Sequence, residues 1–436
     1  MAARVFSRAA VATAALAVLV VPGPVSGPLS GPVPGPPPAH AQSPDQDPGT
    51  GNCSFPSKPY EGRPWSLQRV LLDELWDASE NPKTGTREGA GIKVAVIDTG
   101  VNTQNPQLTD AVEAKLGENL IPKKPEKNEN GGADPRGNAR GTTDTVGHGT
   151  KVAGIIAARP LKGTGFVGLA PRATIIPIKQ NDSNGSGTAL TLAEAITSAV
   201  AKGAKVINIS QDTAQALGPN SALQQAVSNA IRRNVVIVAS AGNDGVAGNE
   251  KITYPASYEG VLAVAASDRN NERAPFSQSG DFVGIAAPGV DMISTVPRKG
   301  HCADNGTSFS APYVAGVAAL LRAKHPDWKP HEVIAQLQQT AERTIAGHDE
   351  RVGWGVVDPI RALTEDDERP QAPSERGGLE QAERPRAATL RFGETTQERN
   401  ERLGTYAVVG GGVLVAVIAG AAVVQRDRRR RQGAGN

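Results

Sequence analysis

The chain has 436 residues, enough for one large domain with extensions at its ends. Hydrophobic residues make up 39% of the sequence, which is enough for a substantial core. The formal net charge of +2 is close to neutral, and the basic residues are spread out except for one cluster near the C-terminus. Composition therefore gives no reason to expect a nucleic-acid partner.

The N-terminus has the pattern of a secretory signal peptide. Arg4 and Arg8 precede an apolar run over residues 9–21, which is too short for a comfortable membrane span. A stretch rich in Pro and Gly follows, and Ala39-His40-Ala41 matches an A-x-A cleavage site. We therefore predict a signal peptide over residues 1–41, with an uncleaved anchor as the alternative.

Short apolar runs alternate with helical patterns through the middle of the chain. Runs rich in β-branched residues indicate buried strands at Val94–Ile97, Val206–Ile209, Val235–Ala239 and Val261–Ala265. Helical spacing indicates helices at Ala189–Ala201 and Ala222–Arg232. This alternation predicts an α/β fold, a mostly parallel sheet with helices on both faces, whose sites lie at the carboxyl ends of the strands.

Three candidate catalytic residues follow apolar runs or precede helical ones. Asp98 ends the first run, His148 lies in a Gly-His-Gly-Thr segment before residues 152–158, and Ser308 precedes the apolar helix expected at Tyr313–Leu321. A serine hydroxyl needs an adjacent base to act as a nucleophile, and histidine can take and return its proton. A carboxylate orients the histidine, so we predict a catalytic triad of Asp98, His148 and Ser308.

An acyl-transfer site also needs hydrogen-bond donors for the developing oxyanion. Asn243 follows the third strand run, and its side-chain amide can act together with the backbone N–H of Ser308 at a helix start. The residues after two neighbouring strands are then expected to line the substrate pocket. They are Ser210, Gln211, Asp212, Thr213, Ala241 and Gly242.

Four segments, in this order along the chain, resemble the signature blocks of the subtilisin family: Ile97-Asp98-Thr99-Gly100, Gly147-His148-Gly149-Thr150, Ala241-Gly242-Asn243 and Gly306-Thr307-Ser308. The resemblance covers residues 90–364. It implies a three-layer subtilisin-like fold and a serine endopeptidase that cleaves proteins or peptides through an acyl-enzyme. No cofactor or metal is expected. Many members have Ser-Leu-Gly-Gly where this chain has Ser210–Thr213, which indicates a narrowed or polar pocket. A shifted loop without effect on specificity is the alternative.

The C-terminal part of the chain has the pattern of a membrane anchor. Tyr406–Val424 is apolar and uncharged, so a transmembrane helix is predicted at residues 405–425. The polar residues 365–404 are expected to form a flexible linker, and the basic tail 426–436 is expected to stay in the cytoplasm. A buried core helix is the alternative.

This topology places the catalytic domain outside the cytoplasmic membrane. In such a compartment Cys53 and Cys302 are expected to form a disulfide bond, with two free thiols as the alternative.

The layout as a whole resembles the mycosins, the membrane-anchored subtilases of type VII secretion systems. The features that carry this resemblance are the segment 42–89 before the first strand, a polar insertion over about Glu118–Thr143, the linker and the span. The resemblance implies that residues 42–89 wrap the catalytic domain and that a type VII secretion membrane complex is the partner. The insertion is either a partner-binding element or a solvated loop. An endopeptidase acting in the cell envelope is the first hypothesis, and a structural component of the secretion apparatus with secondary proteolysis is the alternative.

Overall fold

The protein's structure, a computed structural model, describes residues 53–122, 136–182, 184–213, 220–246, 252–375 and 396–432. The chain divides into two units, residues 1–47 and 48–436. The first unit, which contains the predicted signal peptide, lies outside the described residues. The account below concerns the second unit.

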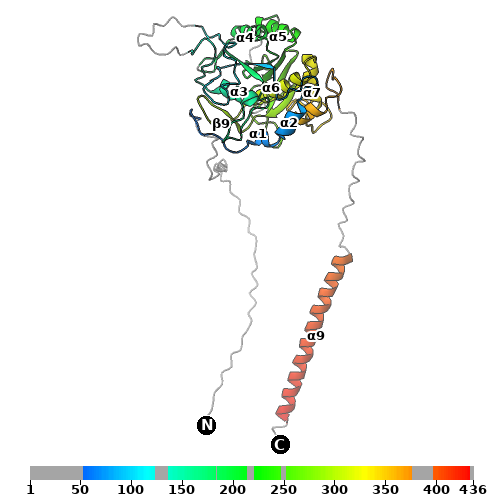
Figure 1. Ribbon diagram of the computed structural model, residues 1–436. Helices are drawn as coiled ribbons and strands as arrows, with labels where there is room; N and C mark the ends of the chain where they lie inside the picture. Colours follow the sequence, from blue (N-terminus) through cyan, green and yellow to red (C-terminus); the bar gives the residue numbers. More distant parts are fainter. Residues whose placement is uncertain are drawn as a thin grey trace, which may run out of the picture. The chain divides into compact units, whose positions relative to one another are not determined.

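The centre of the second unit is a seven-stranded sheet in the order β2-β3-β1-β4-β5-β6-β7 (Figure 1). Every neighbouring pair is parallel. The strands are β1 (Lys93–Asp98), β2 (Glu118–Asn119), β3 (Thr174–Lys179), β4 (Val206–Ile209), β5 (Val236–Ser240), β6 (Val261–Ser267) and β7 (Ile285–Pro288). A separate antiparallel hairpin consists of β8 (Met292–Thr295) and β9 (His301–Asp304).

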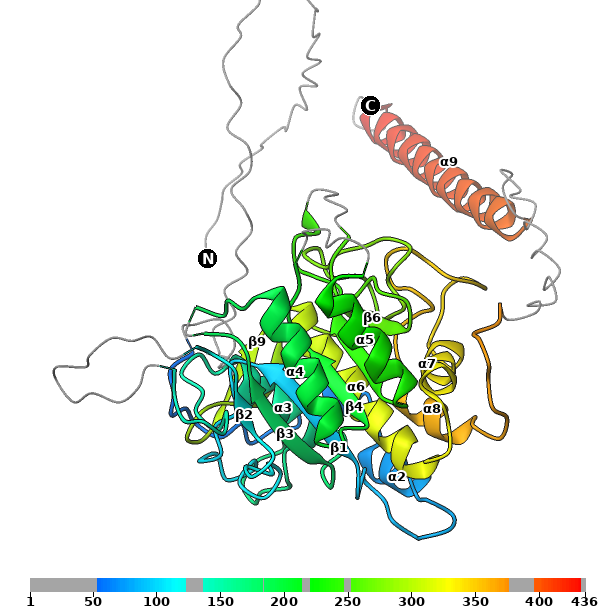
Figure 2. The same cartoon turned by 90° about the horizontal axis from the view of Figure 1, so that it is seen from above.

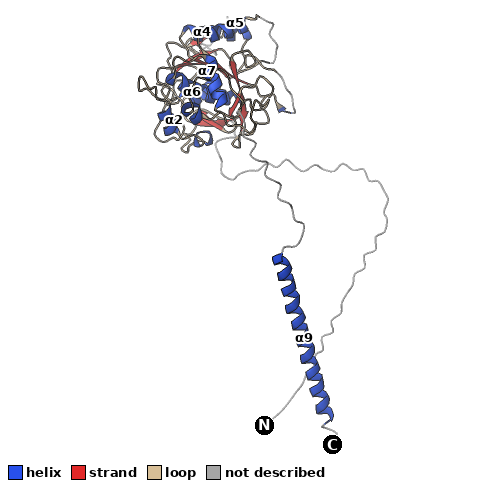
Figure 3. Cartoon of the chain, turned by 90° about the vertical axis from the view of Figure 1, so that its right-hand side faces the viewer, coloured by secondary structure: helices blue, strands red, loops and turns tan. Residues whose placement is uncertain are grey.

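Helices cover both faces of this sheet, as Figure 3 shows by colour and Figure 2 shows for α4 and α5, which lie side by side on one face. The alternation of side chains along each strand explains the two layers. In β1, Ala95 and Ile97 pack in one core with α4 and α5, whereas Val94 and Val96 pack in the other with α3 and α6. The predicted three-layer α/β fold is therefore confirmed. The four helices are α3 (His148–Ala157), α4 (Ala189–Ala201), α5 (Ala222–Arg232) and α6 (Thr307–Lys324).

Side-chain caps explain why α4 and α5 begin where the sequence predicts. The hydroxyl of Thr188 accepts the N–H of Thr191 in a capping box at the start of α4. Ser221 caps α5 by accepting the N–H of Gln224 at 3.3 Å. In both helices the capping residue lies directly before the apolar pattern, and the predicted bounds are confirmed.

Two helices that carry candidate site residues begin earlier than the apolar pattern predicts. Helix α3 begins at His148 instead of residue 152, and α6 begins at Thr307 instead of Tyr313. The first turns are rich in Gly, Ser and Thr and carry no hydrophobic periodicity. Helix α6 also contains Pro312, which normally indicates a position outside a helix interior.

The segment before β1 packs along the domain. It contains α1 (Trp65–Gln68) and α2 (Leu72–Ala78). The indole of Trp76 donates to the carbonyl of Leu169 at 3.0 Å, and the hydroxyl of Tyr313 in α6 donates to the carbonyl of Ser66 at 3.1 Å. Cys53 and Cys302 form a disulfide bond that ties the segment to β9.

The polar insertion contributes a strand to the edge of the sheet. Residues Glu118–Asn119 form β2 and pair with β3, so the insertion is not wholly a loop. The side-chain amide of Asn119 donates to the carbonyls of Arg136 and Asn138, both at 2.9 Å, and so closes the base of the insertion. Residues 123–135 of the insertion, which decide between a partner-binding element and a solvated loop, lie outside the described residues.

Three further helices follow α6 in the described part of the chain. After α7 (Pro330–Gln339) and α8 (Pro359–Thr364), Asp366 is buried and forms an ion pair with Lys324 at 2.7 Å. Packing therefore continues past residue 364 into the segment predicted as linker. Helix α9 (Thr396–Gln432) contains the predicted span at residues 405–425, its residues 397–431 are exposed, and the mean hydropathy of its most apolar part is 2.5. Residues 376–395 of the predicted linker lie outside the described residues.

Candidate active site

Asp98 and His148 meet at the carboxyl end of the sheet. Asp98 ends the central strand β1 and is 1% exposed, and His148 is the first residue of α3. The Nδ1 atom of His148 lies 2.8 Å from Oδ1 and 3.0 Å from Oδ2 of Asp98. The N–H of Thr99 donates to Oδ1 at 2.7 Å and helps to hold the carboxylate. A buried carboxylate placed in this way fixes the orientation of an imidazole ring.

The short distance between β1 and α3 depends on Gly149. A Cβ atom at this position would lie 2.2 Å from the carbonyl oxygen of Gly100 and 3.0 Å from the Cβ of Asp98. No other residue fits here without moving α3 away from the strand. The glycine after His148 is therefore required by the close approach of the two elements.

A second buried acid, Asp144, supports the loop in front of α3. Its carboxylate accepts hydrogen bonds from five donors: the Thr99 hydroxyl, the Val146 N–H, the Gly147 N–H, the Thr150 N–H and the Thr150 hydroxyl. Burial is the main cause that raises the pKa of Asp144, and its hydrogen bonds act in the opposite direction. The sequence signal for Asp144 is its position four residues before His148.

Lys179, at the end of β3, completes this buried group. Its ammonium donates to the carbonyls of Thr99 at 2.5 Å and Thr143 at 3.4 Å. Burial lowers the pKa of Lys179, whereas the charges of Asp144 and Asp98 raise it. The sequence signal for Lys179 is a charged residue at the end of an apolar run, which does not by itself show that the residue is buried. Pro177 in the same run obscures the strand pattern, because proline is rare within sheets.

The protonation of His148 depends on opposing effects. Burial lowers the pKa of His148, but the charge of Asp98, the hydrogen bond to Asp98 and the charge of Asp144 outweigh burial and the charge of Lys151. The pKa of His148 is therefore raised above its ordinary value of 6.5. The ring is placed to accept a proton at Nε2 and to be stabilised as an imidazolium.

Ser308 is half-buried in the first turn of α6. The ring of Phe309, its neighbour in the chain, contacts the His148 ring with centroids 5.2 Å apart. This contact brings the start of α6 to His148. Among the described residues, no hydrogen bond to the Ser308 hydroxyl is present.

The backbone of Ser308 has an unusual partner. Pro312 lacks the N–H that would bond the Ser308 carbonyl in a regular helix. The hydroxyl of Ser210 donates to that carbonyl instead, at 2.8 Å, and accepts from the Asn208 amide at 2.8 Å. Ser210, a predicted pocket residue, is thus buried against α6 with its hydroxyl occupied. Asn208, a polar residue within the β4 run, has no role in the sequence prediction.

Asn243 follows β5 and lies against the start of α6. Its Oδ1 accepts from the N–H of Thr307 at 2.9 Å and from the Thr307 hydroxyl at 3.0 Å. Because a backbone N–H can only donate, these bonds orient the amide so that Nδ2 faces away from Thr307. Asn243 is exposed, so Nδ2 is available as a donor beside Ser308.

Three side chains surround Gly242, and among them Asp212 is a predicted pocket residue. A Cβ atom at Gly242 would lie 2.9 Å from Gln278, 3.0 Å from Asp212 and 3.0 Å from Thr253. The positive φ of 107° at Gly242 also favours glycine. Ala241 is fully buried, and its carbonyl accepts from the Thr253 hydroxyl at 2.7 Å.

Two further predicted pocket residues are held by other parts of the chain. The side-chain amide of Gln211 donates to Gln180 at 2.5 Å, and Thr213 pairs through its backbone with Tyr254. Like the bond from Ser210 to α6, these contacts hold the segment after β4 against other parts of the domain. Of this segment, Asp212 is the residue whose side chain faces Gly242.

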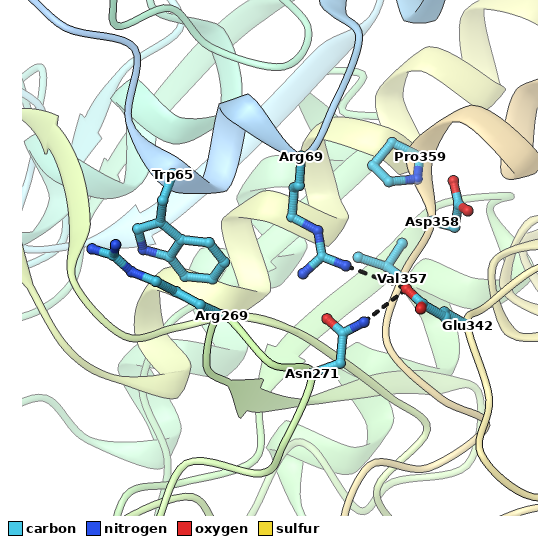
Figure 4. Close-up of a pocket in the computed structure, with 8 residues that line it drawn as sticks. All are labelled: Trp65, Arg69, Arg269, Asn271, Glu342, Val357, Asp358 and Pro359. Atoms are coloured by element: carbon cyan, nitrogen blue, oxygen red, sulfur yellow. Dashed lines mark hydrogen bonds and ion pairs between the residues drawn. The ribbon is translucent and has the colours of Figure 1, made fainter.

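A polar cavity of about 270 Å³ lies elsewhere, between the N-terminal segment and the domain (Figure 4). Arg69 pairs with Glu342 at 3.6 Å, and the Arg269 guanidinium lies 5.7 Å from the centre of a Trp65 ring. The Trp65 indole donates to the carbonyl of Val290 at 2.9 Å. No predicted site residue lines this cavity. The residues around it attach the N-terminal segment to the domain. Its lining residues are Trp65, Arg69, Arg269, Asn271, Glu342, Val357, Asp358 and Pro359.

Metal ligands are not grouped in the part of the chain that the structure describes. No cluster of three or more His, Cys, Asp or Glu side chains is placed there to hold a metal ion.

Comparison with known proteins yields both a family and structural neighbours. The model of the subtilase family of peptidases matches residues 89–355. Thermitase of Thermoactinomyces vulgaris is 37% identical over 309 residues, which cover 71% of this chain and 99% of thermitase. The crystal structure of MycP1 with its N-terminal propeptide removed matches with a TM-score of 0.60 at 31% identity, covering 71% of this chain and 99% of the other. MycP3 protease from the type VII (ESX-3) secretion system matches with a TM-score of 0.59 at 32% identity, covering 71% and 90%.

Proposed function

Because this chain belongs to the subtilase family of serine proteases, we propose that Ser308 is its nucleophile, His148 its general base and Asp98 the acid that orients the base. The observation that carries this proposal is the Asp98–His148 pair, 2.8 Å apart, beside the start of the helix that bears Ser308. The pairing of a buried carboxylate with Nδ1 leaves Nε2 to serve the serine.

The reaction follows from these positions. His148 removes the proton from the Ser308 hydroxyl as the serine oxygen bonds to the substrate carbonyl carbon. The carbonyl oxygen becomes an oxyanion, which accepts hydrogen bonds from Nδ2 of Asn243 and from the N–H of Ser308 in the first turn of α6. His148 then protonates the leaving amine as the C–N bond breaks, which leaves the acyl group on Ser308. In the second half, His148 removes a proton from water as the water oxygen bonds to the acyl carbon, and it returns the proton to the Ser308 oxygen as the ester bond breaks and the acid is released.

The pocket around Gly242 supports a restricted substrate preference. The side chains of Asp212, Thr253 and Gln278 surround Gly242, one residue before the proposed oxyanion donor. These side chains narrow the space beside the scissile bond and make it polar. We expect small or polar residues before the scissile bond in a peptide library, and a preference for large apolar residues there would refute the idea.

Helix α9 supports a single-pass membrane anchor. Its apolar part, Tyr406–Val424, is about 28 Å long at a helical rise of about 1.5 Å per residue, which matches a hydrocarbon core of about 30 Å. The basic residues that follow favour a cytoplasmic tail and an extracytoplasmic protease. The substitution Ala434→Cys in a Cys53→Ser/Cys302→Ser background tests this topology, because only a cytoplasmic tail is shielded from a membrane-impermeant maleimide in intact cells.

A place in type VII secretion is supported by the MycP1 and MycP3 neighbours. The enzyme then acts on a protein of the cell envelope, and a structural role in the secretion apparatus is the second candidate. The Ser308→Ala variant separates the two roles. Loss of peptide cleavage with normal secretion shows that the roles are separable, and loss of both shows that secretion depends on catalysis. Full cleavage activity in this variant would contradict the proposed nucleophile.

A further inference from the structure

A buried lysine, Lys151, lies in α3 three positions after His148. Its side chain is 7% exposed, and its ammonium donates to Oδ2 of Asp304 at 2.7 Å. Burying a charged group costs free energy unless a partner compensates for it. A hydrophobic residue at this position would avoid that cost, so the ion pair calls for an explanation beyond stability.

Asp304, the partner of Lys151, lies close in sequence to the proposed nucleophile. Asp304 ends β9, four positions before Ser308, and its Oδ1 accepts the N–H of Asn305 at 2.9 Å. Asn305 in turn accepts the N–H of Asp291 at 2.7 Å. The Lys151–Asp304 pair therefore links α3, which carries the proposed base, to the segment that leads into α6, which carries the proposed nucleophile.

Phe309 forms a second link on the other side of Ser308. Its ring centre lies 5.9 Å from the Lys151 ammonium, and the ring also contacts His148. Lys151 thus approaches the residues that both precede and follow Ser308.

Attachment of α3 to the hairpin does not require this ion pair. The hydroxyl of Ser294 in β8 donates to the carbonyl of Lys151 at 2.6 Å, and that of Thr295 donates to the carbonyl of Thr150 at 2.9 Å. These bonds are made to the backbone of α3 and do not involve the side chain of Lys151. The side chain of Lys151 is therefore free to serve a different purpose.

We propose that Lys151 is a positioning residue, which sets the distance between Ser308 and His148 by holding Asp304 and Phe309 against α3. The inference rests on the proposed roles of Ser308 and His148. A nucleophile and its base must approach within about 2.6–3.2 Å, and a displacement of about 1 Å can cost roughly 100-fold in rate. A link that spans the two elements controls this distance.

The charge of Lys151 supplies a second readout. The charged groups that face His148 are Asp98 from β1, Asp144 from the loop before α3, and Lys151 from α3 itself. Burial and Lys151 lower the pKa of His148, and the two acids raise it. Loss of the lysine charge removes one of the lowering effects, so the pKa of His148 rises further.

The test compares Lys151→Met, Lys151→Arg and the control Lys162→Met, an exposed lysine beyond α3, in the full-length detergent-solubilised protein. Rates are expressed per active site, titrated with a fluorophosphonate, and are measured below the onset of unfolding of each variant. We expect Lys151→Met to lower kcat about 10- to 100-fold with KM nearly unchanged. In the same variant, the acid limb of the profile of kcat/KM against pH moves to higher pH. Lys151→Arg keeps the limb in place and restores much of kcat, and Lys162→Met matches the parent protein.

Two outcomes overturn the inference. One is a Lys151→Met variant with parental kcat and an unmoved acid limb. The other is a variant that loses only thermal stability, with parental kcat per titrated site. A parent protein that neither cleaves peptide nor reacts with the fluorophosphonate refutes the proposed function instead, so the two failures are distinguishable.

Discussion

At the scale of single residues, the proposed chemistry depends on how His148 and Asn243 are oriented. Asp98 holds one nitrogen of the imidazole, and Thr307 holds the oxygen of the Asn243 amide. In each case one end of a side chain is bound so that the other end faces the proposed reaction centre. Such preorganised groups lose little free energy of reorganisation during the reaction.

The raised pKa of His148 predicts the pH dependence of activity. His148 must be neutral to accept the serine proton, so kcat/KM falls as the pH decreases through the pKa of His148. Because this pKa is raised, we expect the midpoint of the acid limb above 6.5, the ordinary histidine value. A profile of kcat/KM against pH measures it, and a midpoint well below 6.5 would contradict the described electrostatics.

The Asn243 amide predicts a specific kinetic defect. Asn243→Ala removes the proposed hydrogen-bond donor to the oxyanion of the transition state, so kcat is expected to fall roughly 100- to 1000-fold with little change in KM. Steady-state kinetics with a peptide substrate test this expectation. Asn271→Ala, at the distant cavity, is the control. A raised KM with unchanged kcat would instead indicate that Asn243 binds the ground state.

At the scale of secondary structure elements, β4 and α6 are joined through an irregularity in the helix. Pro312 leaves the Ser308 carbonyl without its helical donor, and Ser210 supplies one. The sequence predicts neither the helical state of residues 307–312 nor this partner. Pro312 removes the usual sequence signal for a helix at residues 307–312. The hydrogen bond between Ser210 and Ser308 joins residues 98 positions apart, which no local pattern indicates.

The Ser210 hydroxyl takes the place of the backbone N–H that Pro312 lacks, which predicts that substitutions at these two positions have non-additive effects on stability. Ser210→Ala leaves the Ser308 carbonyl unpaired, so we expect a loss of about 1–3 kcal/mol in the free energy of unfolding. Adding Pro312→Ala restores a backbone N–H to that carbonyl and recovers part of the loss. Urea denaturation in a Ser308→Ala background, which prevents self-cleavage, measures both. Strict additivity of the two changes would contradict the link between them.

Strong local signals account for the elements that the sequence predicts well. Buried strands rich in β-branched residues and the capped helices α4 and α5 lie within a residue or two of their predicted bounds. Asp98 and His148 are predicted because each lies where a strand ends or a helix begins. Asp144, Lys151 and Lys179 are missed because a charged side chain in isolation does not show that it is buried. The partners of Lys151 and Lys179 also lie far away in sequence.

At the scale of the whole molecule, the N-terminal segment and the β8–β9 hairpin are joined next to the proposed site. Cys53 is bonded to Cys302 in β9, and the N–H of Tyr60 donates to Nδ1 of His301 at 3.0 Å. Nε2 of His301 consequently carries the proton and donates to Gln107 at 2.6 Å. A neutral histidine thus links three separate parts of the chain.

This histidine predicts a loss of stability in acid. Burial lowers the pKa of His301 to about 4, whereas the unfolded chain has its ordinary value of 6.5. Between these values the unfolded state binds more protons, so stability decreases as the pH falls from 6.5 toward 4. Once the pH is below both pKa values, the loss in the free energy of unfolding is on the order of 3 kcal/mol.

Urea denaturation at neutral and acidic pH, in the Ser308→Ala background, tests the His301 linkage. We expect His301→Gln to be less sensitive to acid than its parent. The difference between the two proteins isolates His301 from His148, whose raised pKa acts in the opposite direction. Equal pH dependence in both proteins would show that His301 is not the buried neutral group described here.

The identity of the nucleophile is the central claim, and labelling of the full-length protein with a fluorophosphonate tests it most directly. Mass spectrometry of the labelled protein is predicted to place the adduct on Ser308 alone. The adduct should be absent in Ser308→Ala and strongly reduced in His148→Ala, where the serine lacks its base. A protein that stays unlabelled, or an adduct on a different serine, would contradict the account.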